Sequence, residues 1–268
     1  MEEKFNKLKD IIRDMDSLLI AYSGGVDSTF LLKAAADILR DRVVAVTATA
    51  PTYPSREIEA AKEIAKKLGV RHQLISSNEL DVPGFSSNPT NRCYFCKKEL
   101  FDKLKTKAAD LGLNYVADGS NYDDIKDYRP GRDAAKELGI RSPLVEAGLT
   151  KAEIRGIARR LNLPNWDKPS FACLSSRFPY GTEITIPRLR QIENCENILR
   201  EKGFRQFRVR YHNEIARIEV GEDEIQGFFE KDTRDYIAER FKENGFTYIT
   251  VDIQGYRTGS MNQLLTKS

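Results

Sequence analysis

The sequence predicts an α/β protein: an open parallel sheet with helices on both faces, followed by a small C-terminal α+β domain. Strand-like and helix-like segments alternate from residue 17 to about residue 165, which is typical of parallel strands joined by helical crossovers. From residue 188 the order changes to helix, two strands, helix and strand, which favours an antiparallel hairpin packed on helices. We therefore expect a first domain over 1–165, a connector over 166–187 and a second domain over 188–268.

Short apolar runs and helical patterns define the elements of the first domain. The expected strands are Leu18–Tyr22, Val43–Thr47, Gln73–Ile75 and Tyr115–Asp118. The expected helices, with apolar residues at helical spacing, are Met1–Asp16, Ser28–Leu39, Ser55–Leu68, Lys97–Leu111, Arg132–Leu138 and Lys151–Leu161. Because ligands bind at the carboxyl ends of parallel strands, the functional loops should follow the last residue of each strand.

Proline and glycine crowd the connector, and both periodicities fail there. The residues concerned are Pro164, Pro169, Pro179, Gly181 and Pro187. Beyond the connector we expect a helix over Arg188–Lys202, strands over Phe207–His212 and Ile215–Val220, a helix over Asp232–Asn244 and a strand over Thr247–Ile253. Asn213-Glu214 would form the turn between the first two of these strands.

Length and charge exclude several classes of protein. With 268 residues, the chain can bury one large core or two modest ones. No apolar run approaches the roughly 20 residues of a membrane span, and the N-terminal helix has no signal-peptide core, so we expect a cytoplasmic protein. The net charge is only +3, and fifteen basic residues balance fifteen acidic ones from Arg177 onward, so no membrane or nucleic-acid partner is expected.

The turn after the first strand carries the clearest chemical signal. Tyr22-Ser23-Gly24-Gly25-Val26-Asp27-Ser28 joins an apolar strand to a helix. Two adjacent glycines let backbone N–H groups point at an anion, and the helix N-terminus adds partial positive charge, so the turn suits phosphate oxygens. We expect Asp27 or Ser28 to cap the helix and to reach a metal ion or phosphate. An ordinary strand-to-helix turn is the alternative.

Ser23-Gly24-Gly25-Val26-Asp27-Ser28 resembles the pyrophosphate loop of the PP-loop ATP pyrophosphatase superfamily, whose fold is adenine nucleotide alpha hydrolase-like. The resemblance implies adenylation: ATP and Mg²⁺ bind, a substrate oxygen attacks the α-phosphorus, and pyrophosphate leaves. It assigns the phosphates to Ser23, Gly24, Gly25, Asp27 and Ser28, with Asp27 catalytic. By their strand-end positions, Ala21, Thr47 and Gly119 would lie beside the adenosine. The polar loop formed by 118–121 and 124–129 could reach Mg²⁺ or ATP, or could simply be solvated.

The cysteines suggest a metal centre. The chain has four cysteines, Cys93, Cys96, Cys173 and Cys195, and two histidines, His72 and His212. Cys195 falls on the apolar face of a helix and is expected in the core. Cys93 and Cys96 form a CxxC immediately before a helix, in a loop expected to face the nucleotide. A redox dithiol would not need a third cysteine, and a closed zinc site lacks donors. If the connector folds over this loop, three thiolates suit a [4Fe–4S] cluster with one open iron. The alternative is a CxxC turn and a separate cysteine.

Two arginines on one strand suggest an anion clamp. Arg208 and Arg210 are two residues apart, so they project from one face of the strand, and His212 continues that face. Paired guanidinium groups bind phosphate or carboxylate well. Glu219, on the neighbouring strand, could order one of the arginines. An exposed basic strand with surface ion pairs is the alternative.

Longer motifs resemble the LarE family, the sulfur transferases that build the nickel-pincer nucleotide cofactor. These are the connector motif from Lys168 to Gly181, Asp127-Tyr128-Arg129-Pro130-Gly131, Arg208-Val209-Arg210-Tyr211-His212-Asn213 and Gly255-Tyr256-Arg257-Thr258-Gly259. The resemblance implies that ATP adenylates a carboxylate of pyridinium-3,5-biscarboxylic acid mononucleotide and that sulfur replaces the adenylate. It also implies a homo-oligomer and inorganic sulfide or another sulfur donor. The site residues that it implies for this substrate are Ser176, Arg177, Arg208, Arg210, Glu219 and Arg257.

The family also bears on the route of the sulfur. Some members use a single cysteine that gives up its own sulfur, whereas others use three cysteines around a cluster. Cys93, Cys96 and Cys173 place this chain with the second group, with Cys173 also catalytic. Two other functions stay open: a tRNA 2-thiolation enzyme of the same superfamily, which would need an extended basic face, and a non-catalytic nucleotide-binding or iron–sulfur sensing module.

Overall fold

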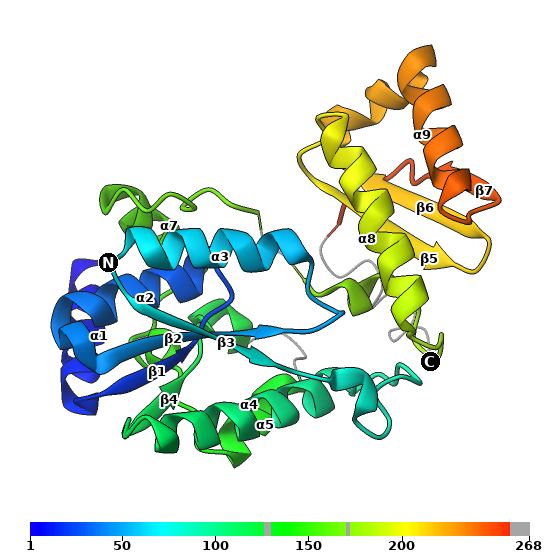
Figure 1. Ribbon diagram of the computed structural model, residues 1–268. Helices are drawn as coiled ribbons and strands as arrows, with labels where there is room; N and C mark the ends of the chain where they lie inside the picture. The colour runs from blue at the N-terminus through cyan, green and yellow to red at the C-terminus, as the bar shows by residue number, and fades with distance from the viewer. Residues whose placement is uncertain (126–129, 170–171, 258–268) are drawn as a thin grey trace. The chain divides into compact units, whose positions relative to one another are not determined.

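The computed structural model describes residues 1–125, 130–169 and 172–257. The chain divides into two compact units, Met1–Phe85 with Thr90–Phe171, and Ser86–Pro89 with Ala172–Ser268 (Figure 1). A short segment ahead of Thr90 thus belongs to the second unit. Several residues of the motifs above lie outside the described residues, namely 126–129, 170–171 and 258–268.

Four parallel strands form the sheet of the first unit, as the sequence predicts. They are β1 (Leu18–Ala21), β2 (Val43–Thr49), β3 (Arg71–Ser76) and β4 (Tyr115–Ala117), in the order β3-β2-β1-β4. The chain runs outward from β1 to β3 and then returns to the other side of β1. The strand order therefore reverses between β1 and β4, and ligands of open α/β sheets bind at the carboxyl ends of strands at such a point.

Helices cover both faces of this sheet (Figure 1). Alternate side chains of β1 point to opposite faces, with Leu18 and Ile20 in one apolar core and Leu19 in the other. The first core is completed mainly by α1 (Glu2–Met15), α2 (Val26–Leu39), α3 (Ser55–Lys67), α6 (Pro143–Glu146) and α7 (Lys151–Arg160). The second is covered by α4 (Arg92–Asp110) and α5 (Gly131–Glu137).

The second unit is the expected small α+β domain. Its elements include η4 (Leu174–Arg177), α8 (Ile186–Glu201), β5 (Phe207–His212), β6 (Ile215–Val220), α9 (Lys231–Glu243) and β7 (Tyr248–Val251). β5 and β6 form the predicted antiparallel hairpin, and β7 adds a parallel strand beside β6. Asn213 takes φ 55° in the turn, a conformation that asparagine tolerates. Cys195 of α8 is fully buried, so its assignment to the core is confirmed.

Two local expectations are wrong. α4 begins at Arg92, five residues before the predicted start at Lys97, so Cys93 and Cys96 lie in the first turns of the helix rather than before it. No proline or glycine interrupts this stretch, and nothing local prevents the helix from starting early. Neither Asp27 nor Ser28 caps α2, because Gly25 occupies the N-cap and the helix starts at Val26.

No described helix combines the length and apolarity that crossing a membrane would require.

Candidate functional site

The glycine turn after β1 has the shape of an anion-binding loop. Gly25 is extended, with φ −76° and ψ 163°, and its carbonyl accepts the first helical hydrogen bond from Thr29 at 2.9 Å. Ser28 Oγ donates to the Gly25 carbonyl at 3.2 Å and lies 3.1 Å from Ser23 Oγ. The Gly25 N–H donates to Ser23 Oγ at 3.3 Å on the exposed side of the turn. Two hydroxyls and an amide at the start of α2 therefore surround one position suited to phosphate.

Glycine is required at two positions around this loop because other segments of the same chain approach closely. Gly24 has φ +67°, and a Cβ there would lie 2.9 Å from Ala61 Cβ of α3. Gly119 follows β4, and a Cβ there would lie 2.9 Å from the Ser28 backbone nitrogen. The loops after β1 and β4 are thus in contact at the point where the strand order reverses, which agrees with the predicted ligand position.

Asp27 is held by residues from two distant segments. Lys151 Nζ lies 2.5 Å from Asp27 Oδ2, and Asn121 Nδ2 donates to the same oxygen at 3.2 Å. Asp27 Oδ1 is buried and has no hydrogen-bond partner among the described residues. Lys151 opens α7 at a capping box formed by Thr150 and Glu153. A cation and an unpaired carboxylate oxygen therefore lie together beside the loop, and sequence reasoning missed the lysine.

The carboxyl ends of β1 and β2 are joined by buried hydrogen bonds. Thr47 Oγ1 donates to the Tyr22 carbonyl at 2.7 Å and lies 2.8 Å from His72 Nε2. Burial lowers the pKa of His72, aided by the charge of Lys62, and burial raises the pKa of Tyr22 to about 12. Thr47 therefore fixes the strand ends where adenosine was predicted, and Ala21 is the last residue of β1.

The polar loop after β4 is ordered mainly by its own hydrogen bonds. Asp118 accepts from Ser120 Oγ and Ser142 Oγ, each at 2.7 Å. Asp123 Oδ2 accepts from the Lys151 backbone N–H at 2.8 Å. Asp124 accepts from the Asn121 backbone N–H at 3.0 Å. Asp123 thus holds the start of α7, and with it Lys151, against the loop.

The CxxC pair lies on one face of the first turns of α4, because its members are three residues apart. Cys93 is exposed, and Cys96 Sγ donates to Glu79 Oε1 at 3.3 Å. Glu79 is only 1% exposed, and its other carboxylate oxygen accepts from Thr52. Burial raises the pKa of this carboxyl. Sequence reasoning missed Glu79. The only feature of the sequence that could have indicated it is that it is an acidic residue in the loop after the third strand.

None of the four cysteines forms a disulfide, and the three proposed as ligands come from both units. Cys93 and Cys96 belong to the first unit, and Cys173 belongs to the second, where it precedes η4. Within the described parts of the chain, no three His, Cys, Asp or Glu side chains gather in a way that could hold a metal ion. The shared cluster accordingly stays a prediction.

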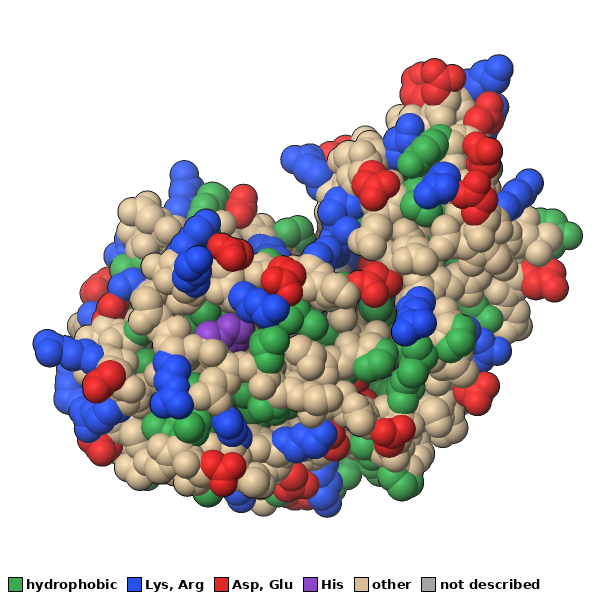
Figure 2. Space-filling model, viewed as in Figure 1, with side chains coloured by type: hydrophobic (Ala, Val, Ile, Leu, Met, Phe, Trp, Pro, Cys, Tyr) green, Lys and Arg blue, Asp and Glu red, His purple; other side chains and the backbone are tan. Residues whose placement is uncertain are grey.

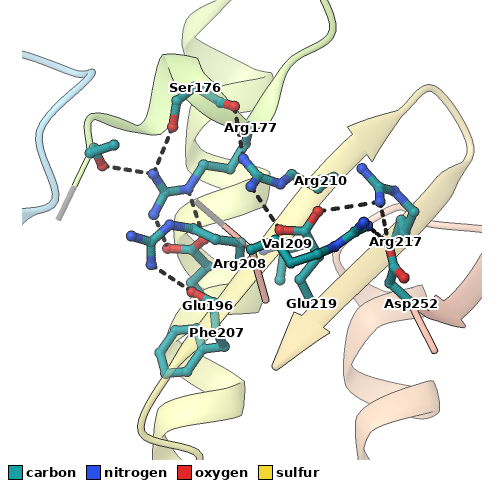
Figure 3. A network of polar contacts seen from close by, with 12 residues as sticks. Ser176, Arg177, Glu196, Phe207, Arg208, Val209, Arg210, Arg217, Glu219 and Asp252 are labelled. Carbon is teal, nitrogen blue, oxygen red and sulfur yellow. Dashed lines mark hydrogen bonds and ion pairs between the residues drawn. The ribbon is translucent and has the colours of Figure 1, made fainter. Parts of the chain in front are cut away.

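Arg177 is the centre of a buried network in the second unit (Figure 3). Its side chain is fully buried and forms a two-pronged pair with Glu196 of α8, with Nε–Oε1 at 2.8 Å and Nη2–Oε2 at 3.0 Å. Its third nitrogen donates to the Cys173 carbonyl at 3.0 Å and to Ser176 Oγ at 3.0 Å. From its buried position, Arg177 therefore fixes the Cys173 carbonyl and the Ser176 side chain.

Arg208 and Arg210 project from one face of β5, as predicted (Figure 3). Arg210 donates to the Ser176 carbonyl at 3.0 Å and to Glu219 Oε2 at 2.7 Å, so Glu219 orders an arginine. Arg208 lies over the Tyr256 ring, 5.1 Å from its centroid. Burial and the neighbouring Arg177 lower the pKa of Arg208 to about 10, which leaves the group charged at neutral pH.

The network has an excess of positive charge. Arg217 bridges Glu219 and Asp252 at 3.2 Å and 2.5 Å, and Arg257 lies 3.7 Å from Asp252. The guanidinium groups belong to Arg177, Arg208, Arg210, Arg217 and Arg257, and the carboxylates belong to Glu196, Glu219 and Asp252. Among the described residues, this surplus of two positive charges matches the charge of a phosphate monoester.

Fold and loop together define a PP-loop protein of the α/β class. Residues 17–100 match the family described as queuosine biosynthesis protein QueC. An uncharacterized protein of Synechocystis is 47% identical over 267 residues, covering 100% of both chains.

Pyridinium-3,5-bisthiocarboxylic acid mononucleotide synthase of Lactiplantibacillus plantarum is 39% identical over 258 residues, covering 96% of this chain and 93% of that one. The chain therefore belongs to the LarE family, ATP-dependent sulfur transferases of the PP-loop superfamily. A tRNA-cytidine(32) 2-sulfurtransferase of Geobacter sulfurreducens is more distant, at 29% identity over 43% of this chain and 47% of that one.

Proposed function

We propose that this enzyme replaces a carboxylate oxygen of pyridinium-3,5-biscarboxylic acid mononucleotide with sulfur, at the expense of ATP. The observation that carries the proposal is the guanidinium cluster with its surplus of positive charge, in a relative of a synthase that makes the corresponding bisthiocarboxylic acid. A mononucleotide offers one phosphate monoester, which the cluster suits, and ring carboxylates that ATP can activate.

In the first step a substrate carboxylate oxygen attacks the α-phosphorus of ATP. The bond between the α-phosphorus and its bridging oxygen breaks, pyrophosphate leaves, and an acyl-adenylate forms. Ser23, Ser28 and the loop amides would bind the β- and γ-phosphates. Lys151, held beside Asp27, would neutralise the charge that develops on the leaving pyrophosphate. Ala21, Thr47 and Gly119 would border the adenosine.

Mg²⁺ would bind beside this loop. The buried, unpaired Oδ1 of Asp27 is the kind of hard oxygen donor that Mg²⁺ prefers, and Mg²⁺ commonly uses one carboxylate together with phosphate oxygens and water. When bound, the ion supplies charge neutralisation at the phosphates. Asp27 and the neighbouring lysine would together set the charge balance at the leaving group.

The substrate phosphate would bind in the second unit. Arg208 and Arg210 offer guanidinium groups from one strand face, and Ser176 lies against Arg210. Because Arg177 is fully buried against Glu196, we give it the task of positioning Ser176 rather than of contacting solvent-exposed substrate. Arg257 and Glu219 would adjust the charge and orientation of the clamp.

Sulfur would replace the adenylate at the activated carboxyl carbon, and AMP would leave with its oxygen. We propose that Cys93, Cys96 and Cys173 hold a [4Fe–4S] cluster, which supplies an exchangeable sulfide when bound. The donor set fits this group, because none of the three cysteines forms a disulfide and thiolates are the preferred ligands of iron–sulfur clusters. On binding iron, Cys96 would lose the proton that it donates to Glu79 in this structure, so Glu79 would keep the contact only in its protonated form, as the donor.

Mass spectrometry of an anaerobic reaction tests this function. The protein is incubated with ATP, Mg²⁺, sulfide and the dicarboxylate mononucleotide, and both product and protein are weighed. We expect a thiocarboxylate product together with AMP and pyrophosphate. The proposal would be refuted if pyrophosphate were released independently of the mononucleotide and if the mononucleotide contained no sulfur after the reaction.

The distant tRNA sulfurtransferase defines the competing function. Basic and acidic side chains are interspersed over the face of the molecule in Figure 2, and the charge of the chain from Arg177 onward is balanced. An RNA-binding enzyme would gather positive charge over a longer surface. Salt-sensitive binding of tRNA, together with thiolation of one of its bases, would favour tRNA thiolation over sulfur transfer to the mononucleotide.

A further inference from the structure

Asn165 joins the pyrophosphate loop from a segment that has no other role in the site. It follows α7, is only 5% exposed, and belongs to the first unit. Its Nδ2 lies 2.9 Å from the Gly24 carbonyl oxygen and 2.9 Å from Thr29 Oγ1. A carbonyl oxygen can only accept, so the side-chain atom facing Gly24 must be the NH₂ group.

The contact fixes the orientation of one peptide plane. In a trans peptide the carbonyl oxygen and the following N–H point in opposite directions, and the chain has no cis peptide among its described residues. The Gly24 carbonyl points inward to Asn165, so the Gly25 N–H must point outward. That N–H does lie on the exposed side of the turn, where it meets Ser23 Oγ.

The opposite orientation of this peptide is sterically accessible. Gly24 has no Cβ and lies at φ +67°, so the plane between Gly24 and Gly25 can rotate at little steric cost. A rotated plane would present a carbonyl oxygen, instead of an N–H, to the phosphates. A loop of adjacent glycines therefore needs an external contact to select the anion-binding orientation.

The Asn165 amide is buried although only its nitrogen has hydrogen-bond partners among the described residues. Its Oδ1 atom has no hydrogen-bond partner among the described residues, which is unfavourable for a buried amide. The following residues are anchored independently, since Lys168 Nζ pairs with Glu57 of α3 at 2.6 Å and the Lys168 carbonyl accepts from Arg155 of α7 at 2.8 Å. The segment is thus held firmly enough to present its amide to the loop.

We infer that Asn165 is a positioning residue that locks the Gly24–Gly25 peptide with its N–H toward the β- and γ-phosphates of ATP. The inference rests on the proposed adenylation and adds a specific consequence. Asn165 should matter for ligands that carry the β- and γ-phosphates and should be indifferent to AMP, which lacks them.

Asn165→Leu keeps the side-chain size and removes the donor. We expect the affinity for ATP and for inorganic pyrophosphate, measured by calorimetry with Mg²⁺, to fall about 10-fold, the scale of one charge-assisted hydrogen bond. The affinity for AMP should stay within about twofold. Thr29→Val is the matched control, because it removes the second partner of Asn165 and leaves the Gly24 contact; it should bind ATP nearly as wild type does.

Wild-type affinity for ATP in Asn165→Leu, or an equal loss for ATP and AMP, would overturn the inference. If Asn165→Leu does not fold, Asn165→Ala is measured with the same ligands and the same criteria. A wild-type protein that binds ATP no better than AMP would refute both the adenylation and the role of Asn165. If wild type and Asn165→Leu both bind ATP in preference to AMP to the same extent, only the role of Asn165 would be refuted.

Discussion

Lys151 provides the sharpest test of how this enzyme activates its substrate. Its ammonium group lies 2.5 Å from Asp27, at the end of the pyrophosphate loop and in the first turn of α2. Lys151→Met preserves the aliphatic stem and removes the charge. Loss of one preorganised group that stabilises developing charge typically lowers a rate by about 10²–10³, equivalent to about 3–4 kcal/mol. We expect that reduction in ATP–pyrophosphate exchange dependent on the mononucleotide.

The effect on folding should be much smaller. The side chains of Lys151 and Asp27 are 29% and 18% exposed, and a partly exposed pair contributes about 1 kcal/mol or less to stability. Lys33→Met is the control, because Lys33 is also 29% exposed and pairs with Asp37 on α2 at 2.6 Å. It should leave exchange within about twofold, since that pair is a surface pair. Exchange by Lys151→Met within about threefold of wild type would refute the assignment, because the charge that was removed would then not stabilise the leaving pyrophosphate.

Three further predictions concern the thiols, the arginines and pH. The proposed iron–sulfur cluster should colour the protein brown. Cys173→Ala should abolish that colour and sulfur transfer yet keep ATP–pyrophosphate exchange, whereas Cys195→Ala, in the core, should retain both colour and transfer. Arg208→Ala should weaken mononucleotide binding about 10–100-fold without changing the KM for ATP, whereas Arg205→Ala, on an exposed side chain, should change neither. Burial, with the charge of Arg217, lowers the pKa of His212 below its usual 6.5, so the folded protein binds fewer protons than the unfolded chain. Stability should therefore fall as pH decreases below 6.5, and His212→Asn should reduce that fall in Tm.

Each of these predictions has a contrary result. A colourless, metal-free wild-type protein with full activity would remove the cluster. Equal loss of ATP and mononucleotide binding in Arg208→Ala would mean that the clamp is misassigned. A Tm that depends on pH identically in wild type and His212→Asn would show that this histidine does not contribute.

The architecture and the placement of Arg208 and Arg210 on one strand face could be predicted from the sequence because both follow from local periodicity. Alternation along β5 places Arg208 and Arg210 on one face, and hairpin pairing brings Glu219 opposite. The start of α4 was misjudged because a CxxC motif suggests a loop, whereas no residue within it breaks a helix.

The missed residues act through contacts between distant parts of the chain. Lys151 and Asp27 are 124 positions apart, and Asn165 and Gly24 are 141 apart. Glu79 is recognisable only by its burial beside Cys96. Local patterns show which residues share a face of an element, but they do not show which elements meet at that face.

The central claim is that ATP activates a ring carboxylate and that exogenous sulfide, passing through the three-cysteine centre, replaces its oxygen. The most direct measurement is an anaerobic reaction with isotopically heavy sulfide, followed by mass spectrometry of the mononucleotide and the intact protein. We predict heavy sulfur in the product, more than one turnover per protein chain, and an unchanged protein mass. Light sulfur in the product, matched by loss of a cysteine sulfur from the protein, would contradict this account.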